Sequence, residues 1–333
     1  MNQFSTRDGV VVGVDIGGTK IAAGLVNHGG EIISRTRLPM VANGEAATGL
    51  SAVISAIDSL SSTATPEPKI QPLIRAIGIC SPGPLDPITG VVINPPNLPC
   101  WRNFPLATEI AKVYRLPVKV DNDANAAALA EARWGAGRGY RNVFYVAIGT
   151  GIGTGIVFDG PIHHGRTGAA GEGGHLSIDY RGPICGCGKP GCIEVFASGP
   201  AIAKRAQAKL AADHTRRSTI LKWGNGSVDI TSEMVGKAHA GGDPLAKEVL
   251  QETIDFLALW LGNIVDLLEP DVAIIGGGVA SMLTPFFDEL RNRLPSCSVN
   301  SRCREMPIVV AHYGAEAGIA GGAALCAQAF AES

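Results

Sequence analysis

The densest group of chemically active side chains is one histidine followed by three cysteines, His175, Cys185, Cys187 and Cys192. One imidazole and three thiolates, joined by short glycine-rich spacers, can complete the tetrahedral shell of a Zn²⁺ ion. Four protein ligands leave no open position on the metal, which predicts a structural zinc rather than a Lewis acid. A redox pair or a disulfide is the alternative, but Cys185 and Cys187 do not have Cys-x-x-Cys spacing.

A glycine-rich turn near the N-terminus has the composition of a phosphate-binding loop. It contains Asp15, Gly17, Gly18, Thr19 and Lys20, directly after a β-branched strand. Glycine lets backbone N–H groups approach an oxyanion closely, and threonine adds a hydroxyl donor. A carboxylate at a strand end beside such a loop can hold Mg²⁺, directly or through water, so we assign this role to Asp15. Lys20 can neutralise phosphate charge.

The same pattern returns later in the chain, where Gly149, Thr150 and Gly151 separate two further strand-like runs. Aligning Gly17 with Gly149 gives an offset of 132 residues that also matches apolar positions of the flanking strands. This indicates two related α/β units that arose by duplication, each presenting a hairpin toward a shared cleft. Such a pair suits a nucleotide held by its phosphates, although each hairpin alone could be no more than a tight turn.

Three polar residues, Asp121, Asn122 and Asp123, stand between a strand at 118–120 and an alanine-rich helix at 124–134. A side chain at such a junction can project into a cleft. Transfer of a phosphoryl group to a hydroxyl needs a carboxylate that accepts the hydroxyl proton, and Asp123 is our candidate for it. All three residues also suit a helix N-cap, and we expect Asp121 to fill that position and leave Asp123 free.

Hydrophobic periodicity places the other elements. We expect strands over 10–14, 21–26, 32–38, 76–80, 143–148, 153–158, 272–275 and 308–311, helices over 45–60 and from about 316, and a loop over 61–72. The apolar stretch 254–268 contains Asp255, Asn263 and Asp266, and therefore predicts a buried helix rather than a membrane span.

Composition bounds the class of protein. The 333 residues are 46% hydrophobic and 17% charged, with a net charge of -2, which favours two packed domains and gives no sign of a nucleic-acid or membrane surface. The 43 glycines point to many tight turns. The polar N-terminus lacks the apolar core of a signal peptide, so we expect a cytoplasmic protein whose eight cysteines are not a disulfide scaffold.

Several motifs in this order resemble the ROK family, which groups repressors, uncharacterised proteins and sugar kinases. They are the hairpin 15–20, the turn 81–86, the segment 94–98, the junction 122–125, and 171–175 followed by the cysteine cluster. The resemblance implies the actin-like ATPase (ribonuclease H-like) fold, an α/β fold with two lobes around a cleft. We expect one lobe over 9–122, with a C-terminal helix at about 315–333 packed back on it, and a second over 123–314 that carries the zinc site.

The resemblance also implies roles for particular residues. Asp123 matches the catalytic base, and Gly149, Thr150 and Gly151 match the second phosphate loop. The positions that match sugar ligands are Gly83, Asn97, Asn122, Asp123, Glu172, His175 and Glu194, and those that match adenosine-side glycines are Gly276, Gly277 and Gly278. ATP, Mg²⁺ and a structural Zn²⁺ are the implied cofactors, and a homodimer is implied, for which we expect 254–268 to supply part of the contact.

The implied activity is an ATP-dependent sugar kinase, with conversion of glucose to glucose 6-phosphate as the expected reaction. N-acetylmannosamine, N-acetylglucosamine and fructose kinases share the same motifs, and a sugar sensor without turnover is an alternative of another class. The family's repressors carry a DNA-binding segment ahead of the first hairpin. Only fourteen residues precede Asp15, so we do not expect a repressor.

Overall fold

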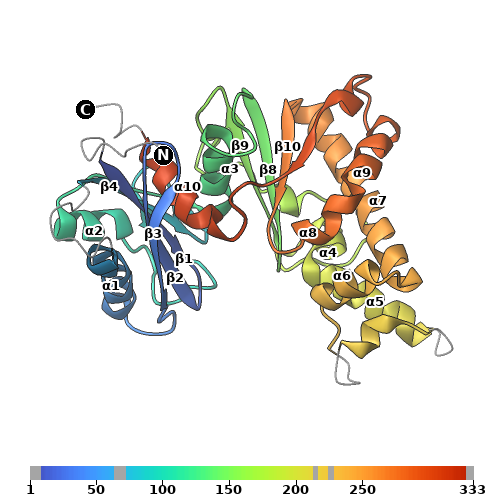
Figure 1. The fold of residues 1–333 in the computed structure, drawn as a ribbon, viewed down its shortest axis with the longest axis horizontal. Coiled ribbons are helices and arrows are strands. Elements are labelled where there is room, and N and C mark those ends of the chain that lie inside the picture. The colour runs from blue at the N-terminus through green and yellow to red at the C-terminus, as the bar shows by residue number, and fades with distance from the viewer. Residues whose placement is uncertain (1–8, 64–72, 213–216, 224–228, 328–333) are drawn as a thin grey trace. The chain divides into compact units, whose positions relative to one another are not determined.

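The protein is described by a computed structural model that covers residues 9–63, 73–212, 217–223 and 229–327. The chain divides into two compact units (Figure 1). Within the described residues, the first unit contains the chain up to Gly139, the segment Gly155–Gly171 and the chain from Ala315. The second unit contains Tyr140–Thr154 and Glu172–Gly314.

This division differs from the boundary that we expected after residue 122. Helix α3 (Asp123–Arg133) groups with the first unit because it packs closely on α10 (Ala317–Leu325). A Cβ atom on Gly321 of α10 would lie only 2.7 Å from the backbone carbon of Ala126, so the two helix backbones almost touch. Helix α10 itself packs on the first unit, and residues 328–333 of the expected C-terminal helix lie outside the described part.

The first unit is built on a five-stranded sheet with the strand order β3-β2-β1-β4-β7. Strands β1, β2 and β3 form an antiparallel meander, and β4 and β7 continue the sheet in parallel with β1. The elements are β1 (Val10–Ile16), β2 (Lys20–Val26), β3 (Ile32–Pro39), α1 (Ala46–Thr63), β4 (Ile74–Ser81), the hairpin β5 (Leu85–Asp86) and β6 (Val91–Val92), α2 (Leu106–Tyr114), β7 (Val118–Asn122), α3 and α10. Helix α1 therefore extends into the region that we expected to be a loop over 61–72, of which 64–72 are not described.

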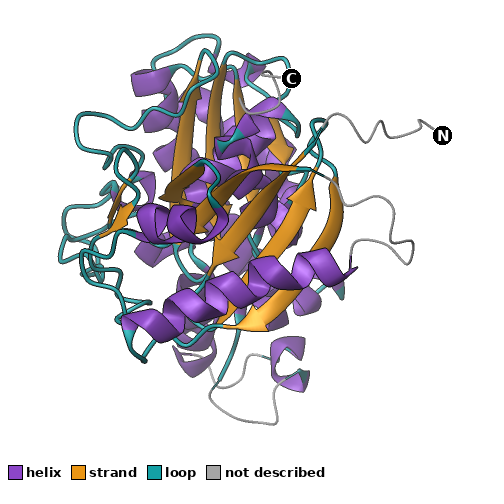
Figure 2. Ribbon diagram, turned by 90° about the vertical axis from the view of Figure 1, so that its left-hand side faces the viewer, coloured by secondary structure: helices purple, strands orange, loops and turns teal. Residues whose placement is uncertain are grey.

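Alternate residues of β1 face two different layers of helices. Val10, Val12 and Val14 belong to a core with α1 and α2, whereas Val11 packs with Ile319 of α10. Because side chains alternate along a strand, a continuous β-branched run marks a sheet covered on both faces. Figure 2 shows the long helix α1 lying across the strands of this sheet.

Helix α10 packs so closely on the sheet that glycine is required on both sides of the contact. A Cβ on Gly13 of β1 would lie 1.9 Å from the carbonyl oxygen of Ile319, and one on Gly78 of β4 would lie 1.7 Å from that of Gly322. Any larger residue at these strand positions would push the helix away from the sheet. Much of the high glycine content of the sequence thus serves packing as well as turns.

The second unit contains most of a four-stranded sheet, ordered β11-β10-β8-β9, of which β10 pairs in parallel with both β8 and β11. The bounds are β8 (Asn142–Ile148), β9 (Ile152–Phe158), α4 (Glu194–Ala197), α5 (Gly199–Ala212), α6 (Ser232–Ala240), α7 (Pro244–Leu268), β10 (Val272–Gly276), α8 (Ala280–Leu283), α9 (Phe287–Arg293) and β11 (Ile308–Val310). Short 3-10 helices occupy Gly173–His175, Thr219–Lys222, Thr284–Phe286, Leu294–Ser296, Cys303–Glu305 and Gly314–Glu316.

The two sheets share an order of strands. The sequence β2-β1-β4-β7 in the first sheet corresponds to β9-β8-β10-β11 in the second, and in both the last three strands run in parallel. Each sheet also begins with a hairpin at a glycine turn. This correspondence agrees with the offset of 132 residues between Gly17 and Gly149 in the sequence.

The long helix α7 confirms that the apolar stretch 254–268 is a mostly buried helix. Ile254, Leu257, Leu261 and Ile264 are each at most 3% exposed, whereas Leu267 remains 74% exposed. Asp243 caps the first turn by accepting a hydrogen bond from the backbone of residue 246 at 2.9 Å. Among the described residues, no helix combines the length and apolar character that crossing a membrane requires.

Candidate active site and metal centre

The first hairpin that we predicted to bind phosphate lies at the tight turn between β1 and β2, closed by a hydrogen bond of 2.9 Å from the Gly17 N–H to the Lys20 carbonyl. Asp15, near the end of β1, is half-buried. Burial and, to a smaller extent, the nearby Asp123 raise the pKa of its carboxyl to about 6, although Lys20 and Arg37 oppose the shift. Because its ionised form is destabilised by the surroundings, this carboxylate is suited to bind a cation, which would stabilise the charge.

Two loops approach this hairpin and the start of α3. A Cβ on Gly18 would lie 2.9 Å from the carbonyl oxygen of Asn97, so the loop that we predicted to bind sugar lies against the hairpin. Gly83 precedes a cis proline. A Cβ on Gly83 would lie 3.7 Å from the side-chain amide nitrogen of Asn122. The structure therefore brings Gly83, Asn97, Asn122 and the first hairpin together in one unit.

The cap of α3 differs from our expectation, which assigned it to Asp121. Asn122 is the N-cap residue: its Oδ1 accepts the backbone N–H of Ala124 at 2.9 Å and that of Asn125 at 3.5 Å. The reason is geometric, because a cap must directly precede the first helical residue, and α3 begins at Asp123. Asn122 therefore keeps its amide N–H₂ as the part of the side chain that can donate to a ligand.

Asp121 instead lies behind this junction, with its side chain 5% exposed. Its Oδ1 accepts the Asn122 N–H at 2.7 Å and the Asn125 amide at 3.2 Å, and its Oδ2 lies 2.6 Å from Nε2 of His164. The Asp121 carboxylate raises the pKa of the His164 imidazole, against a smaller opposing effect of burial. We assigned no role to His164 from the sequence, and nothing in the local pattern links it to Asp121.

In the second unit, Glu194 holds the turn between β8 and β9. Its Oε2 accepts the backbone N–H of Ile152 at 2.9 Å, and a Cβ on Gly151 would lie 2.5 Å from the same oxygen. Its Oε1 lies 3.6 Å from the Cys185 thiol. One oxygen of this predicted sugar ligand is thus already committed to the second phosphate turn.

A cavity of about 480 Å³ opens beside that turn, within the second unit. It is lined by Gly149, Thr150, Gly199, Pro200, Ala203, Ile230, Thr231, Ser232, Gly278 and Val279. Its size fits a small organic ligand. The starts of α5 and α6 contribute most of the wall, and the sequence does not indicate them because helix starts far apart along the chain share no common signal.

Gly276 ends β10 and Gly277 and Gly278 follow it, and the three glycines have different surroundings. Gly278 lines this cavity, in keeping with its predicted place on the adenosine side. Gly276 and Gly277 pack on β8 instead: a Cβ on Gly276 would lie 2.5 Å from the Tyr145 hydroxyl, and one on Gly277 would lie 2.3 Å from the Ile148 carbonyl oxygen. Packing on β8 therefore requires glycine at both positions, and their role on the adenosine side stays a prediction.

The four predicted zinc ligands converge. The ligand atoms of His175, Cys185, Cys187 and Cys192 all lie within 4.8 Å of one another. Nδ1 of His175 is 3.6 Å from Sγ of Cys185, and the Sγ atoms of Cys187 and Cys192 are also 3.6 Å apart. With metal bonds of about 2.3 Å to sulfur and 2.0–2.1 Å to nitrogen, tetrahedral zinc separates its ligand atoms by roughly 3.6–3.8 Å. The donor set and its spacing therefore fit Zn²⁺.

His175 offers this cluster only its Nδ1 atom, so Nε2 is left for another partner. The turn that carries His175 is fixed by Gly173, whose N–H donates to the Thr154 hydroxyl at 2.8 Å and whose carbonyl accepts the Trp260 indole N–H at 2.9 Å. A Cβ on Gly174 would lie 1.9 Å from the Ile152 carbonyl oxygen. Glu172, by contrast, is exposed.

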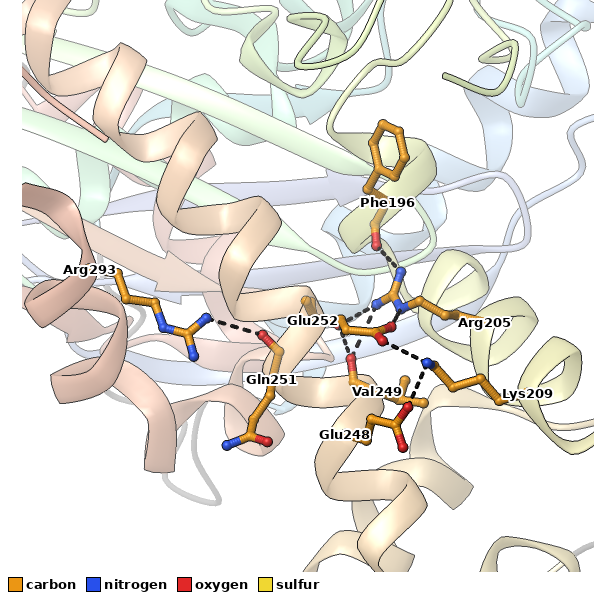
Figure 3. A network of polar contacts seen from close by, with 9 residues as sticks. Phe196, Arg205, Lys209, Glu248, Val249, Gln251, Glu252 and Arg293 are labelled. Carbon is orange, nitrogen blue, oxygen red and sulfur yellow. Dashed lines mark hydrogen bonds and ion pairs between the residues drawn. The ribbon is translucent and has the colours of Figure 1, made fainter. Parts of the chain in front are cut away.

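A polar network anchors α4, the short helix that carries Glu194 (Figure 3). The Arg205 guanidinium, on α5, donates to the Phe196 carbonyl at 2.6 Å and also to the Thr253 hydroxyl of α7. Lys209 pairs with Glu248 at 2.7 Å and also with a second glutamate one turn later in α7. Because Arg205 is largely buried, these bonds tie α4 firmly to the two longer helices.

Proteins of known function and structure resemble this chain over nearly its whole length. A glucokinase from Streptomyces coelicolor is 34% identical over 322 residues, which cover 96% of this chain and 98% of that protein. A ROK family glucokinase from Streptomyces griseus, solved with glucose and AMPPNP, is 34% identical with a TM-score of 0.80 and covers 95% of this chain and 99% of its own. A ROK family transcriptional regulator, described as a homolog of the E. coli MLC protein, has a TM-score of 0.86 at 28% identity and covers 98% of this chain and 80% of its own.

The solved glucokinase and its structural relatives share the actin-like ATPase fold, so the α/β fold class that we expected is confirmed. The sequence profile of the ROK family matches residues 11–329, almost the whole length of the chain. The protein belongs to the ROK family.

Proposed function

We propose that this protein is an ATP-dependent sugar kinase that phosphorylates a hydroxyl of glucose. The observation that carries the proposal is the junction of β7 and α3. Asn122 is held by its own helix cap, Asp123 follows it at the start of α3, and the first phosphate hairpin and Asp15 belong to the same unit. A pure sugar sensor has no need of a carboxylate placed beside a phosphate loop.

In the proposed reaction, the Asp123 carboxylate accepts the proton of the sugar hydroxyl while the hydroxyl oxygen forms a bond to the γ-phosphorus of ATP. The bond from that phosphorus to the bridging oxygen breaks, and ADP leaves. Asn122 donates its amide N–H₂ to a sugar hydroxyl, since its Oδ1 is occupied by the cap. The backbone N–H groups of the glycine hairpins bind phosphate oxygens, and Lys20 offsets their charge.

Asp15 is the proposed holder of Mg²⁺, which supplies charge neutralisation at the transferring phosphate. Zn²⁺ is the proposed occupant of the His175 and cysteine cluster. Zn²⁺ bound to Nδ1 would fix the orientation of the imidazole. The Nε2–H could then donate a hydrogen bond to a sugar hydroxyl. Glu172, which is exposed, is the proposed acceptor of further hydroxyl hydrogen bonds.

The test measures the release of ADP from Mg·ATP with a coupled assay. The sugars compared are glucose, mannose, fructose, N-acetylglucosamine and N-acetylmannosamine. We expect turnover with glucose that falls by at least about 100-fold in Asp123→Asn, because the base is lost. Asp288→Asn, a change at a carboxylate that is 84% exposed, is the matched control and should retain full activity. Preference for another sugar would replace glucose as substrate, and sugar binding without ADP release would favour the sensor.

A further inference from the structure

A second cavity, of about 780 Å³, lies within the first unit and belongs to none of the sites above. Its walls come from the edge strand β7, from α3 and the end of α10, from the β5–β6 hairpin and from the loop after β9. It is lined by Pro87, Ile88, Thr89, Gly90, Ala107, Val118, Lys119, Val120, Asp121, Leu129, Arg133, Gly160, Pro161, Ile162, His164, Ala324 and Leu325. It contains none of the predicted sugar, nucleotide or zinc ligands.

The lining of the cavity has more basic than acidic side chains. Lys119 on β7, Arg133 at the end of α3 and His164 in the loop after β9 are its basic side chains, and Asp121 is its one acidic lining residue. Both oxygens of Asp121 are already occupied by hydrogen bonds from Asn122, Asn125 and His164. Lys119 has no ion-pair partner within the described part of the chain, and the Arg133 guanidinium stacks on the neighbouring Trp134 ring at 5.7 Å. A ligand therefore meets cations whose charge is not balanced.

His164 adds a directional donor. Its Nε2 is bound to Asp121, so in the protonated imidazole the Nδ1–H is the group left to donate to a ligand. The Asp121 carboxylate raises the pKa of His164, which keeps the imidazolium populated at a higher pH than usual. Lys119 and Asp121 share one side of β7, because residues two apart on a strand face the same way.

We propose that this cavity binds a small phosphate monoester, with the dianion held by Lys119, Arg133 and the imidazolium of His164. Its volume falls in the range of small-molecule sites, and its apolar wall of Leu129, Ile162 and Leu325 can cover the carbon skeleton of such a ligand. A phosphate monoester carries close to two negative charges at neutral pH. A guanidinium and an ammonium are the side chains that most often bind such a group.

The proposal is tested by titrating glycerol 3-phosphate into the intact protein in a calorimeter, with glycerol as the neutral control. We expect a dissociation constant of about 1 mM or tighter for the phosphate ester and none for glycerol. The double variant Lys119→Glu and Arg133→Glu should weaken binding by at least about tenfold, while Lys204→Glu on the surface of α5 should leave it unchanged. Because the readout is binding, a failure of the kinase assay does not decide this result.

The pH dependence supplies a second measurement. Binding should be tightest between the second phosphate pKa of about 6 and the raised pKa of His164, and should weaken at higher pH as the imidazole loses its proton. In His164→Asn, the weakening at high pH should disappear. The proposal would be overturned if the wild type did not bind the ester. It would also be overturned if the double variant bound it equally well, because the ligand would then occupy another site, such as the glycine hairpins. If the double variant does not fold, each single substitution should weaken binding at least about threefold.

Discussion

Replacing Asp15 by asparagine should stabilise the ligand-free protein while destroying its proposed use of Mg²⁺. The pKa of Asp15 rises from 3.8 to about 6, chiefly through burial. The folded protein therefore holds the Asp15 proton more tightly than the unfolded chain does. At pH values above the folded pKa, ionising this carboxyl costs the folded state up to about 3 kcal/mol, from a shift of roughly two units at 1.36 kcal/mol each. Asparagine has nearly the same shape and carries no charge, so the variant avoids this cost.

The sign of the pH dependence follows from the same shift. Below pH 3.8 both states are protonated at this site, and the stability difference vanishes; it grows as the pH rises through the window up to about 6, and is complete above it. At pH 5 the gain should be about half of that at pH 7.5. Urea unfolding of wild type and Asp15→Asn at these two pH values, without magnesium or nucleotide, measures it. In a melting experiment at pH 7.5 the gain corresponds to roughly 4 °C, because the entropy of unfolding of a chain of this length is about 0.7 kcal/mol/K.

Asp86→Asn is a control with the opposite sign. The Asp86 carboxylate is half-buried and accepts hydrogen bonds from the Thr89 hydroxyl at 2.7 Å and the Ile88 N–H at 2.9 Å, which lower its pKa. Its ionised form is therefore favoured by folding, and its loss should slightly destabilise the protein at pH 7.5. If Asp15→Asn were no more stable than the wild type at pH 7.5, burial would not be the cause of the shift and the reasoning would fail.

Other substitutions test the parts that hold the site. Cys187→Ser should release zinc, seen by elemental analysis, and lower the melting temperature, whereas Cys297→Ser outside the cluster should keep both unchanged. Gly174→Ala should cost about 1–3 kcal/mol in urea unfolding, because its Cβ would lie 1.9 Å from a backbone carbonyl oxygen; Gly186→Ala, with open space around it, should cost less than about 0.5 kcal/mol. Arg205→Met should cost about 1.5–3 kcal/mol by leaving the end of α4 unanchored, and equal stability would show that this network is dispensable.

Features of the sequence that act over a short range were predicted well. The four predicted zinc ligands converge, and they lie within eighteen consecutive residues whose glycine spacers leave little choice of chain path; zinc itself stays a prediction. The hairpins at Gly17 and Gly149 were found because a β-branched run ended by a glycine turn is a local signal. Element ends moved by a few residues, as in α1, since helix ends depend on packing as well as on propensity.

Features that depend on distant contacts were not predicted. Any of three polar residues suits the cap of α3 from the sequence; the cap is Asn122 because it directly precedes the first helical residue, and Asp121 contacts His164, 43 positions away, instead. The resemblance in sequence implies a domain boundary after residue 122, before α3. Contact with the glycine-rich face of α10, near the other end of the chain, decides otherwise.

The two glutamates expected to bind sugar show why residue type alone cannot fix a role. Glu172 is exposed and has both oxygens available for hydroxyl groups, whereas Glu194 spends one oxygen on the backbone of Ile152 and places the other beside Cys185. Glu194 thus connects the turn 149–151 to the predicted zinc ligands, and neutralising it would disturb both. Loss of Glu172 should therefore affect sugar affinity alone, and loss of Glu194 should affect sugar affinity, nucleotide affinity and zinc content together.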